Sequence, residues 1–510
     1  MGNCSRPRSH PPHSVASRVI IGLLAAAFAA SCAGPPLRHS HASPGETPRQ
    51  LARAASIPDG TLRRDIAIAR ALESLSYENG NLPPNISLKW EGRPAIDPLS
   101  FHHVIPAKAV RRRGWRRVWH EEPGVGSPLV LLRERDNDDF VGKIGEILPV
   151  TAVLDQTASG FGLTLHDSIA PGSATTTHRG QAIARDYTAP LAYLLRRDDL
   201  MPELRALFRS GRFLDDLGLY RLSPYDPDKI PVIFVHGLKS SPQVWANLVN
   251  DLKATPEIRD RFQFWVFSYP TGIPILYSAM RLRQELQTMR KHYDPPGSNP
   301  NMNNIVLVGH SMGGILSRLM ISGSSERLLA WIPKPIDDLK LPPELQKLSR
   351  ELMVFEPQPY IKRALYIATP HRGSEVAGLR IVRRATSFIR VPRELRSAAL
   401  TALRLNPDLA LIPDATLDSL NSIENLRPGS RFMEAMADQP TAPGIPYHSI
   451  IGICEESRGK PLEQTDDSLV TYASAHLDGA ESELTVAAPH KAFDNPESIA
   501  EVIRILKLHR

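Results

Sequence analysis

Cysteine is scarce in this chain of 510 residues, which contains only Cys4, Cys32 and Cys454. The sequence shows no cluster of metal ligands, no phosphate-cradling glycine loop, no internal repeat and no coiled-coil heptad. The apolar run near the N-terminus, Val19–Ala30, has 12 residues, too few to cross ~30 Å of hydrocarbon as a permanent helix. We therefore expect no metal or other cofactor, no membrane-spanning anchor at this run, and a fold that depends on its apolar core.

The N-terminus has the plan of a secretory signal, which we assign to residues 1–31. Residues 1–18 are polar and basic, the apolar run follows, and Ala29-Ala30-Ser31-Cys32 ends it with small side chains. This ending resembles the bacterial lipoprotein signal, with Ala29 where leucine is usual. The resemblance implies a lipid on Cys32 and a bacterial envelope protein anchored in a membrane through that lipid, the outer membrane being favoured; the alternative is an ordinary signal peptide cut nearby.

Processing at Cys32 would also settle the cysteine chemistry. Cys4 would be lost with the signal and Cys32 would carry lipid, so Cys454 would be the only thiol left. An intrachain disulfide is then impossible, and the remaining chain is long enough to fold on its core alone.

The formal charge of +7 first suggests an anionic partner. Three of these charges, Arg6, Arg8 and Arg18, lie in the expected signal, which leaves +4, so we expect no nucleic-acid partner. One local cluster could hold phosphate or lipid headgroups, or could be a solvated basic turn: Arg111, Arg112, Arg113, Arg116 and Arg117 with Trp115 and Trp119.

The mature chain divides into three parts by composition. Residues 32–57 are rich in Pro, Ser, His and Arg and predict a lipidated tether. Residues 58–225 predict a smaller, β-rich accessory domain of unreadable role, with a helix over 61–77 and short strand-like runs at Pro128–Leu132, Leu148–Leu154, Gly160–Leu165 and Ala189–Leu195.

Residues 226–510 follow a different pattern, in which an apolar strand, a turn and an amphipathic helix repeat. Five strands are predicted, with a further strand-like run at Leu484–Ala487 and a final helix over Pro496–Leu508: Pro231–Val235, Phe262–Phe267, Ile305–Val308, Ala364–Ala368 and Ser449–Ile453. Uninterrupted apolar strands that alternate with helices predict a mostly parallel, doubly wound α/β sheet covered on both faces.

A nucleophile motif follows the third of these strands. Gly309-His310-Ser311-Met312-Gly313-Gly314 leads directly into the helical stretch Ile315–Ile321. In a G-x-S-x-G elbow the strand-to-helix turn is so tight that the residues flanking the serine must lack bulk, and the strain presents its hydroxyl. Ser311 is therefore the predicted nucleophile, rather than a serine of a structural turn.

A serine nucleophile needs a histidine as base and an acid to orient that histidine. The downstream candidates are His448, His476, His490 and His509; His490 is favoured because it lies between a strand-like run and the final helix, whereas His448 and His509 are expected at the surface. For the acid, Asp467 is favoured, and Asp466 either caps the turn or is the acid itself.

The oxyanion formed in acyl transfer needs two fixed donors. We expect the backbone N–H groups of Met312, directly after the nucleophile, and of Leu238, in the loop after the first strand, where Gly237 allows close approach. His236 is expected to be structural.

Five motifs together resemble the α/β-hydrolase superfamily, and within it the bacterial lipase and serine esterase branch: His236-Gly237, Gly309–Gly314, Thr369–Ser374, Asp466–Val470 and the His490 loop. The match covers about residues 225–510, and it departs at Ser468, where the family often has glycine. The resemblance implies an enzyme that cleaves carboxylic esters, with an ester or lipid as its substrate.

Two long insertions, about 322–360 and 375–445, are expected to form helical caps over this site. Their apolar side chains either line an acyl pocket or lid, or only hold the caps on the sheet: Trp331, Ile332, Leu341, Leu345, Leu348, Met353, Phe355, Phe388, Ile389 and Val391. Two alternatives to ester hydrolysis stay open: a serine-dependent acyltransferase or phospholipase acting on envelope lipids, and a non-catalytic lipoprotein that uses the fold to bind a partner.

Overall fold

The computed structural model describes a defined part of the chain: residues 43, 45–77, 82–111, 118–135, 138–142, 145–195, 217–330, 334–375, 393–411, 422–437 and 439–510. The chain splits into two compact units, Met1–Ser43 and Pro44–Arg510, and the fold described below belongs to the second. The predictions for Cys32, for most of the basic cluster, and for Trp331, Ile332, Phe388, Ile389 and Val391 lie outside the described residues.

A seven-stranded sheet organises the C-terminal part of the chain. Its strands lie in the order β10, β12, β11, β13, β14, β15, β16, and all neighbours are parallel except β10 and β12. The bounds are Gly218–Arg221 for β10, Ile230–Val235 for β11, Phe262–Ser268 for β12, Ile305–His310 for β13, Ile361–Ile367 for β14, Tyr447–Ile453 for β15 and Ser482–Ala487 for β16. The predicted parallel sheet is confirmed, and β10, which the sequence did not indicate, joins it from before residue 226.

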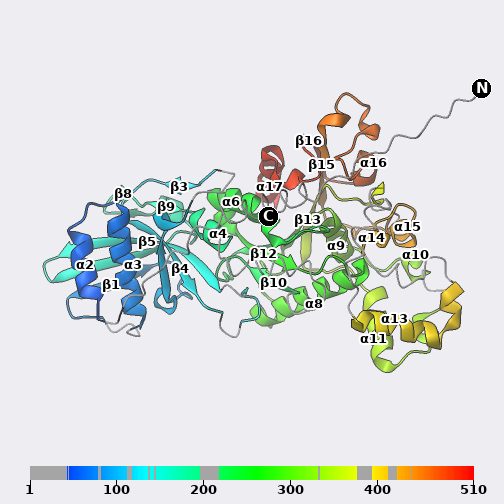
Figure 1. Ribbon diagram of the computed structural model, residues 1–510, viewed down its shortest axis with the longest axis horizontal. Helices are drawn as coiled ribbons and strands as arrows, with labels where there is room; N and C mark the ends of the chain where they lie inside the picture. The colour runs from blue at the N-terminus through cyan, green and yellow to red at the C-terminus, as the bar shows by residue number, and fades with distance from the viewer. Residues whose placement is uncertain are drawn as a thin grey trace, which may run out of the picture. The chain divides into compact units, whose positions relative to one another are not determined.

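Helices cover both faces of this sheet, because successive side chains of a strand point to opposite faces. Ile233 and Val235 of β11 pack in one core cluster with side chains of α8 (Ile275–Tyr293) and α9 (Met312–Met320). Val232 and Phe234 pack in a second cluster with side chains from three other helices: α6 (Ala246–Ala254), α7 (Pro256–Arg261) and α17 (Pro496–Leu508). Strands buried on both faces explain why their sequences show no alternation of polar and apolar residues (Figure 1).

The N-terminal part of this unit contains a separate five-stranded sheet, ordered β1, β6, β5, β4, β2. Its bounds are Ile86–Glu91 for β1, His103–Pro106 for β2, Ser127–Arg133 for β4, Glu146–Thr157 for β5 and Gly160–Asp167 for β6, and α3 (Leu62–Tyr77) packs on it. The helix over 61–77 and three of the four strand-like runs are confirmed.

The fourth of these runs was assigned wrongly. Ala189–Leu195 is not a strand, since residues Ala189–Leu194 form helix α4. Proline is found at the first helical positions, where its missing N–H costs nothing, and alanine and leucine are strong helix formers. Pro190 therefore begins a helix in a run whose apolar residues alone do not distinguish helix from strand.

Part of the segment predicted as a tether is also folded. Residues Thr47–Ala55 form helix α2, whose Leu51 and Ala54 are fully buried against α3. The N–H of Glu46 donates to Ser74 Oγ at 3.1 Å and ties the start of the helix to α3. Burying one leucine contributes about 1.5–3 kcal/mol, enough to order a short helix against a neighbour although its composition reads as a linker.

Both insertions are helical in their described parts, as predicted. The first contains α10 (Glu326–Leu329) and α11 (Pro343–Met353), and the second contains α13 (Arg393–Leu405), α14 (Ser422–Asn425) and α15 (Arg431–Ala437). Lys340 and Asn406 join the two insertions by reciprocal hydrogen bonds of 2.8 and 2.9 Å. Met353 and Phe355 are buried in the core beside α8 and α9, so these two side chains hold the first insertion on the sheet. No helix in the described part of the chain is long and apolar enough to cross a membrane.

Candidate active site

Ser311 occupies the sharp turn between β13 and α9. Its backbone has φ 53° and ψ −126°, a conformation that costs a non-glycine residue about 1–3 kcal/mol and clusters at functional sites. The surrounding backbone holds it there, because the N–H of Ser311 donates to Ile367 O at 2.9 Å. The strained turn predicted for the G-x-S-x-G motif is therefore present.

The flanking glycines are required by close backbone contacts. A Cβ on Gly309 would lie 2.5 Å from Gly314 Cα, and one on Gly313 would lie 2.1 Å from Val235 O. Any side chain at either position would push α9 away from β11 or from the turn. The requirement for small residues around Ser311 follows directly from this packing.

His490 and Asp467 complete a continuous chain of hydrogen bonds. His490 Nε2 lies 2.9 Å from Ser311 Oγ, and His490 Nδ1 lies 2.8 Å from Asp467 Oδ2. The other oxygen, Asp467 Oδ1, accepts the N–H groups of Leu469 and Val470 at 2.9 and 2.7 Å. Asp467 is 1% exposed, so its carboxylate is fixed and shielded from water. The structure thus brings together the three side chains that the sequence selected.

Asp466 points elsewhere and stabilises the turn. Its Oδ1 accepts the N–H of Ser468 at 2.7 Å, and its Oδ2 accepts the hydroxyl of Ser457 at 3.0 Å. Burial raises the pKa of Asp466, but these hydrogen bonds outweigh it and the pKa is lowered. Ser468 has φ 79°, a left-handed backbone that favours glycine, which explains why this is the position where related sequences often carry glycine.

The two segments predicted to supply oxyanion donors adjoin Ser311. Met312 is the first residue of α9, so its N–H has no acceptor within the helix. The loop after β11 passes beside the nucleophile, since a Cβ on Gly237 would lie 2.9 Å from Ser311 Cβ. Leu238 follows in the same loop and is half-buried. The oxyanion roles of Met312 and Leu238 remain predictions.

The remaining histidines have other partners. His236 is buried, stacks on Tyr269 and contacts Gly237 O through Nδ1 at 3.1 Å, as expected for a structural residue. His476 Nδ1 bonds Glu483 at 2.8 Å. The prediction that His448 and His509 lie at the surface is wrong: they are 1% and 3% exposed, because His448 is part of β15 and the end of α17 folds back so that His509 Nε2 reaches Asn304 O.

Three buried histidines make the stability of the fold dependent on pH. Burial lowers the pKa of His236 and of His448 to about 4, and that of His310 to about 3, from about 6.5 in an unfolded chain. Below pH 6.5 the unfolded chain binds protons that the folded chain does not, so the free energy of unfolding should fall by about 2 kcal/mol per histidine between pH 7.5 and pH 5. Urea denaturation at these two pH values measures the difference, and equal unfolding free energies would contradict the prediction.

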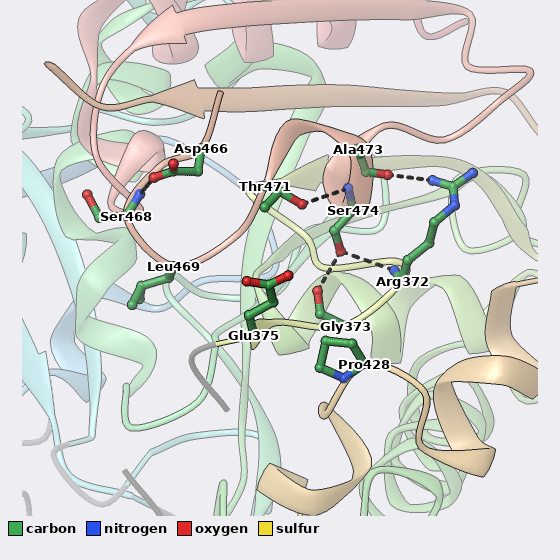
Figure 2. Close-up of a pocket in the computed structure, with 10 residues that line it drawn as sticks. All are labelled: Arg372, Gly373, Glu375, Pro428, Asp466, Ser468, Leu469, Thr471, Ala473 and Ser474. Carbon is green, nitrogen blue, oxygen red and sulfur yellow. Dashed lines mark hydrogen bonds between the residues drawn. The ribbon is translucent and has the colours of Figure 1, made fainter. Parts of the chain in front are cut away.

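A brace holds the turn that carries Asp467, and the sequence gave it no role. Arg372 Nη1 donates to Ala473 O at 2.9 Å, Ser474 Oγ donates to Gly373 O at 2.6 Å, and Ser374 Oγ donates to Leu469 O at 2.5 Å. Figure 2 shows the first two of these bonds between the loop after β14 and the segment after Asp467. The motif Thr369–Ser374 was the available signal, and its polar residues position the acid.

A pocket of about 370 Å³ lies against the outer side of the same turn. Asp466, Ser468 and Leu469 line it together with residues of the brace, whereas Ser311 and His490 do not (Figure 2). This pocket is therefore not the place where a bond to Ser311 would form. Within the described residues no group of three or more His, Cys, Asp or Glu side chains is placed to hold a metal ion.

Comparisons with known proteins agree with the architecture. The family described as PGAP1-like alpha/beta domain matches residues 226–328, which include β11 and the Ser311 turn. No curated protein sequence matches the chain significantly.

Several solved structures share a low level of similarity. The Bacillus licheniformis lipase BlEst2 in mature form is 18% identical, with a TM-score of 0.33, covering 56% of this chain and 97% of that one. The metagenomic carboxyl esterase MGS0156 is 15% identical, with a TM-score of 0.31, over 56% and 78% of the two chains. Esterase B from Lactobacillus rhamnosis is 12% identical, with a TM-score of 0.30, over 63% and 96%. These values are too low to transfer the chemistry of those proteins, so the assignment depends on the strand order and the family match: residues 226–328 form a PGAP1-like α/β domain, within a sheet of α/β-hydrolase type.

Proposed function

We propose that this protein is a serine hydrolase that cleaves carboxylic esters through an acyl-enzyme. The observation that carries the proposal is the unbroken chain of hydrogen bonds from Ser311 Oγ through the imidazole of His490 to the buried carboxylate of Asp467. A serine hydroxyl is a poor nucleophile unless a base takes its proton, and this arrangement supplies the base and the group that orients it.

The steps follow from the geometry. His490 Nε2 accepts the proton as Ser311 Oγ attacks the ester carbonyl carbon, and the backbone N–H groups of Met312 and Leu238 stabilise the oxyanion. The C–O bond to the alcohol then breaks, and His490 returns the proton to the leaving alkoxide. Water attacks the acyl-enzyme with the same base and releases the acid. Asp467 holds the imidazole with Nε2 facing the serine and stabilises the imidazolium.

The strained turn argues against a purely binding role for the fold. Ser311 keeps an unfavourable backbone conformation, and a binding module gains nothing from it. Acyl transfer to an acceptor other than water would use the same triad and the same first half-reaction, so analysis of the products separates it from hydrolysis.

Two measurements test the proposal on the purified full chain. A fluorophosphonate probe should label it covalently, and a chain-length series of p-nitrophenyl esters should be turned over. The series also reports the size of the acyl pocket. A chain that neither labels nor hydrolyses any ester of the series is not the proposed enzyme.

We also propose that a lipid on Cys32 anchors the protein in a bacterial envelope membrane. The small residues before Cys32 support this proposal. Cys32→Ser should move the protein from the membrane fraction to the soluble fraction, measured by fractionation and by incorporation of labelled palmitate, with Cys454→Ser as the matched control. Unchanged membrane recovery of Cys32→Ser would contradict the anchor.

A further inference from the structure

His310 is the last residue of β13 and stands directly before the nucleophile. Its ring is buried, and its Nε2 lies 2.9 Å from the backbone carbonyl oxygen of His490. A carbonyl oxygen only accepts hydrogen bonds, so His310 Nε2 carries the proton and donates it. The residue before the nucleophile therefore contacts the backbone of the base.

The backbone of His490 is held on its other side by the acid. The N–H of His490 donates to Asp467 O at 2.8 Å. Both backbone polar groups of the base are thus fixed by residues at or beside the other two members of the triad. We propose that His310 is a positioning residue, whose Nε2–H holds the loop of His490 at the place where the imidazole reaches Ser311 Oγ; this inference rests on the proposed function.

The surroundings of His310 direct its one hydrogen bond to this carbonyl. The ring packs edge-on against Phe493, with centroids 4.7 Å apart, and its other nitrogen, Nδ1, has no hydrogen-bond partner among the described residues. Nδ1 lies over the oxyanion loop, where a Cβ on Gly237 would come within 3.0 Å of it. The ring therefore fills the space between the loop of Gly237 and the loop of His490, and only the contact with His490 is polar.

A neutral donor suits this position. The His310 and His490 ring centroids are 4.9 Å apart, so a charge on His310 would oppose the imidazolium that forms on His490 during the reaction. Burial lowers the pKa of His310 to about 3, and its ring stays neutral in the pH range where His490 can act as a base. His310 can thus hold the loop without raising the cost of protonating His490.

Glutamine and asparagine at this position provide a matched test. The amide nitrogen of glutamine is separated from Cα by as many bonds as His310 Nε2, whereas that of asparagine is one bond shorter and cannot reach the carbonyl. We expect His310→Asn and His310→Leu to lower kcat about ten- to a hundredfold with KM within about twofold, because displacing a catalytic group by about 1 Å costs on the order of 10²-fold. His310→Gln should restore kcat to within about threefold of the wild type.

The control pair is His448→Gln and His448→Asn, at a buried, hydrogen-bonded histidine near the amino end of β15. There the two amides should give equal kcat, whatever their effect on the melting temperature. Equal kcat for His310→Gln and His310→Asn, both high or both low, in an active wild-type background overturns the positioning role alone. An inactive wild type overturns the proposed function and this inference together.

Discussion

Ser311→Ala is expected to lower kcat for ester hydrolysis by about 10⁵- to 10⁶-fold and to abolish covalent labelling by a fluorophosphonate. The reason is that the acyl-enzyme forms on Ser311 Oγ, the only hydroxyl that His490 Nε2 contacts, at 2.9 Å, in the described residues. The folded state should survive the change, because Ser311 Oγ supports no other part of the fold. Its backbone strain changes little, since alanine also disfavours a φ of 53°.

The matched control is Ser317→Ala on the same helix. Ser317 is fully buried and its Oγ donates to Gly313 O at 2.9 Å, so the change removes one hydrogen bond worth about 1 kcal/mol. Activity and labelling should be kept within about threefold. Labelling that persists in Ser311→Ala would show that another residue is the nucleophile, while the wild-type assays decide separately whether the protein is an ester hydrolase.

The nucleophile and the base could be predicted because their signals are local. Ser311 lies between an apolar strand and a helix, and two glycines mark a turn that only small residues permit. His490 lies between β16 and α17, and both were readable from the sequence. A fold that places loops at the carboxyl ends of its parallel strands then brings these residues to one edge of the sheet.

Features set by tertiary contacts were missed or assigned wrongly. Helix α2 forms because Leu51 meets α3, and His448 is buried because its strand lies inside the sheet. The role of the brace around Arg372 and the bond from His310 to the His490 carbonyl depend on loops that are far apart in the sequence. No periodicity within a segment carries such information.

The choice between the two adjacent acids shows where this limit falls inside the site. From the sequence, Asp466 and Asp467 are equivalent in order and type. In the structure a turn separates them, so that Asp467 faces His490 while Asp466 bonds Ser457 and the N–H of Ser468. The left-handed backbone of Ser468 shapes this turn, and nothing about a serine in the sequence announces it.

Asp467→Asn is accordingly expected to lower kcat by about 10⁴-fold, whereas Asp466→Asn should lower it by less than tenfold. Asparagine can keep the contacts of Asp467 Oδ1 with Leu469 and Val470, because its carbonyl accepts the same N–H groups. Its NH₂ group then faces His490 Nδ1, which must become the acceptor, and the proton moves to Nε2. An imidazole protonated at Nε2 cannot accept the proton of Ser311, and the imidazolium also loses its counter-charge.

At Asp466 the same substitution changes only the turn. The asparagine carbonyl can still accept the N–H of Ser468, and the bond lost or reversed at Ser457 costs stability of about 1 kcal/mol. Steady-state kinetics with one p-nitrophenyl ester, together with melting temperatures for both variants, measures the two effects separately. A greater loss of kcat in Asp466→Asn would reverse the assignment of the acid. Small losses in both variants would mean that His490 works without a carboxylate, because the bond of 2.8 Å to Asp467 would then orient the ring without contributing its charge.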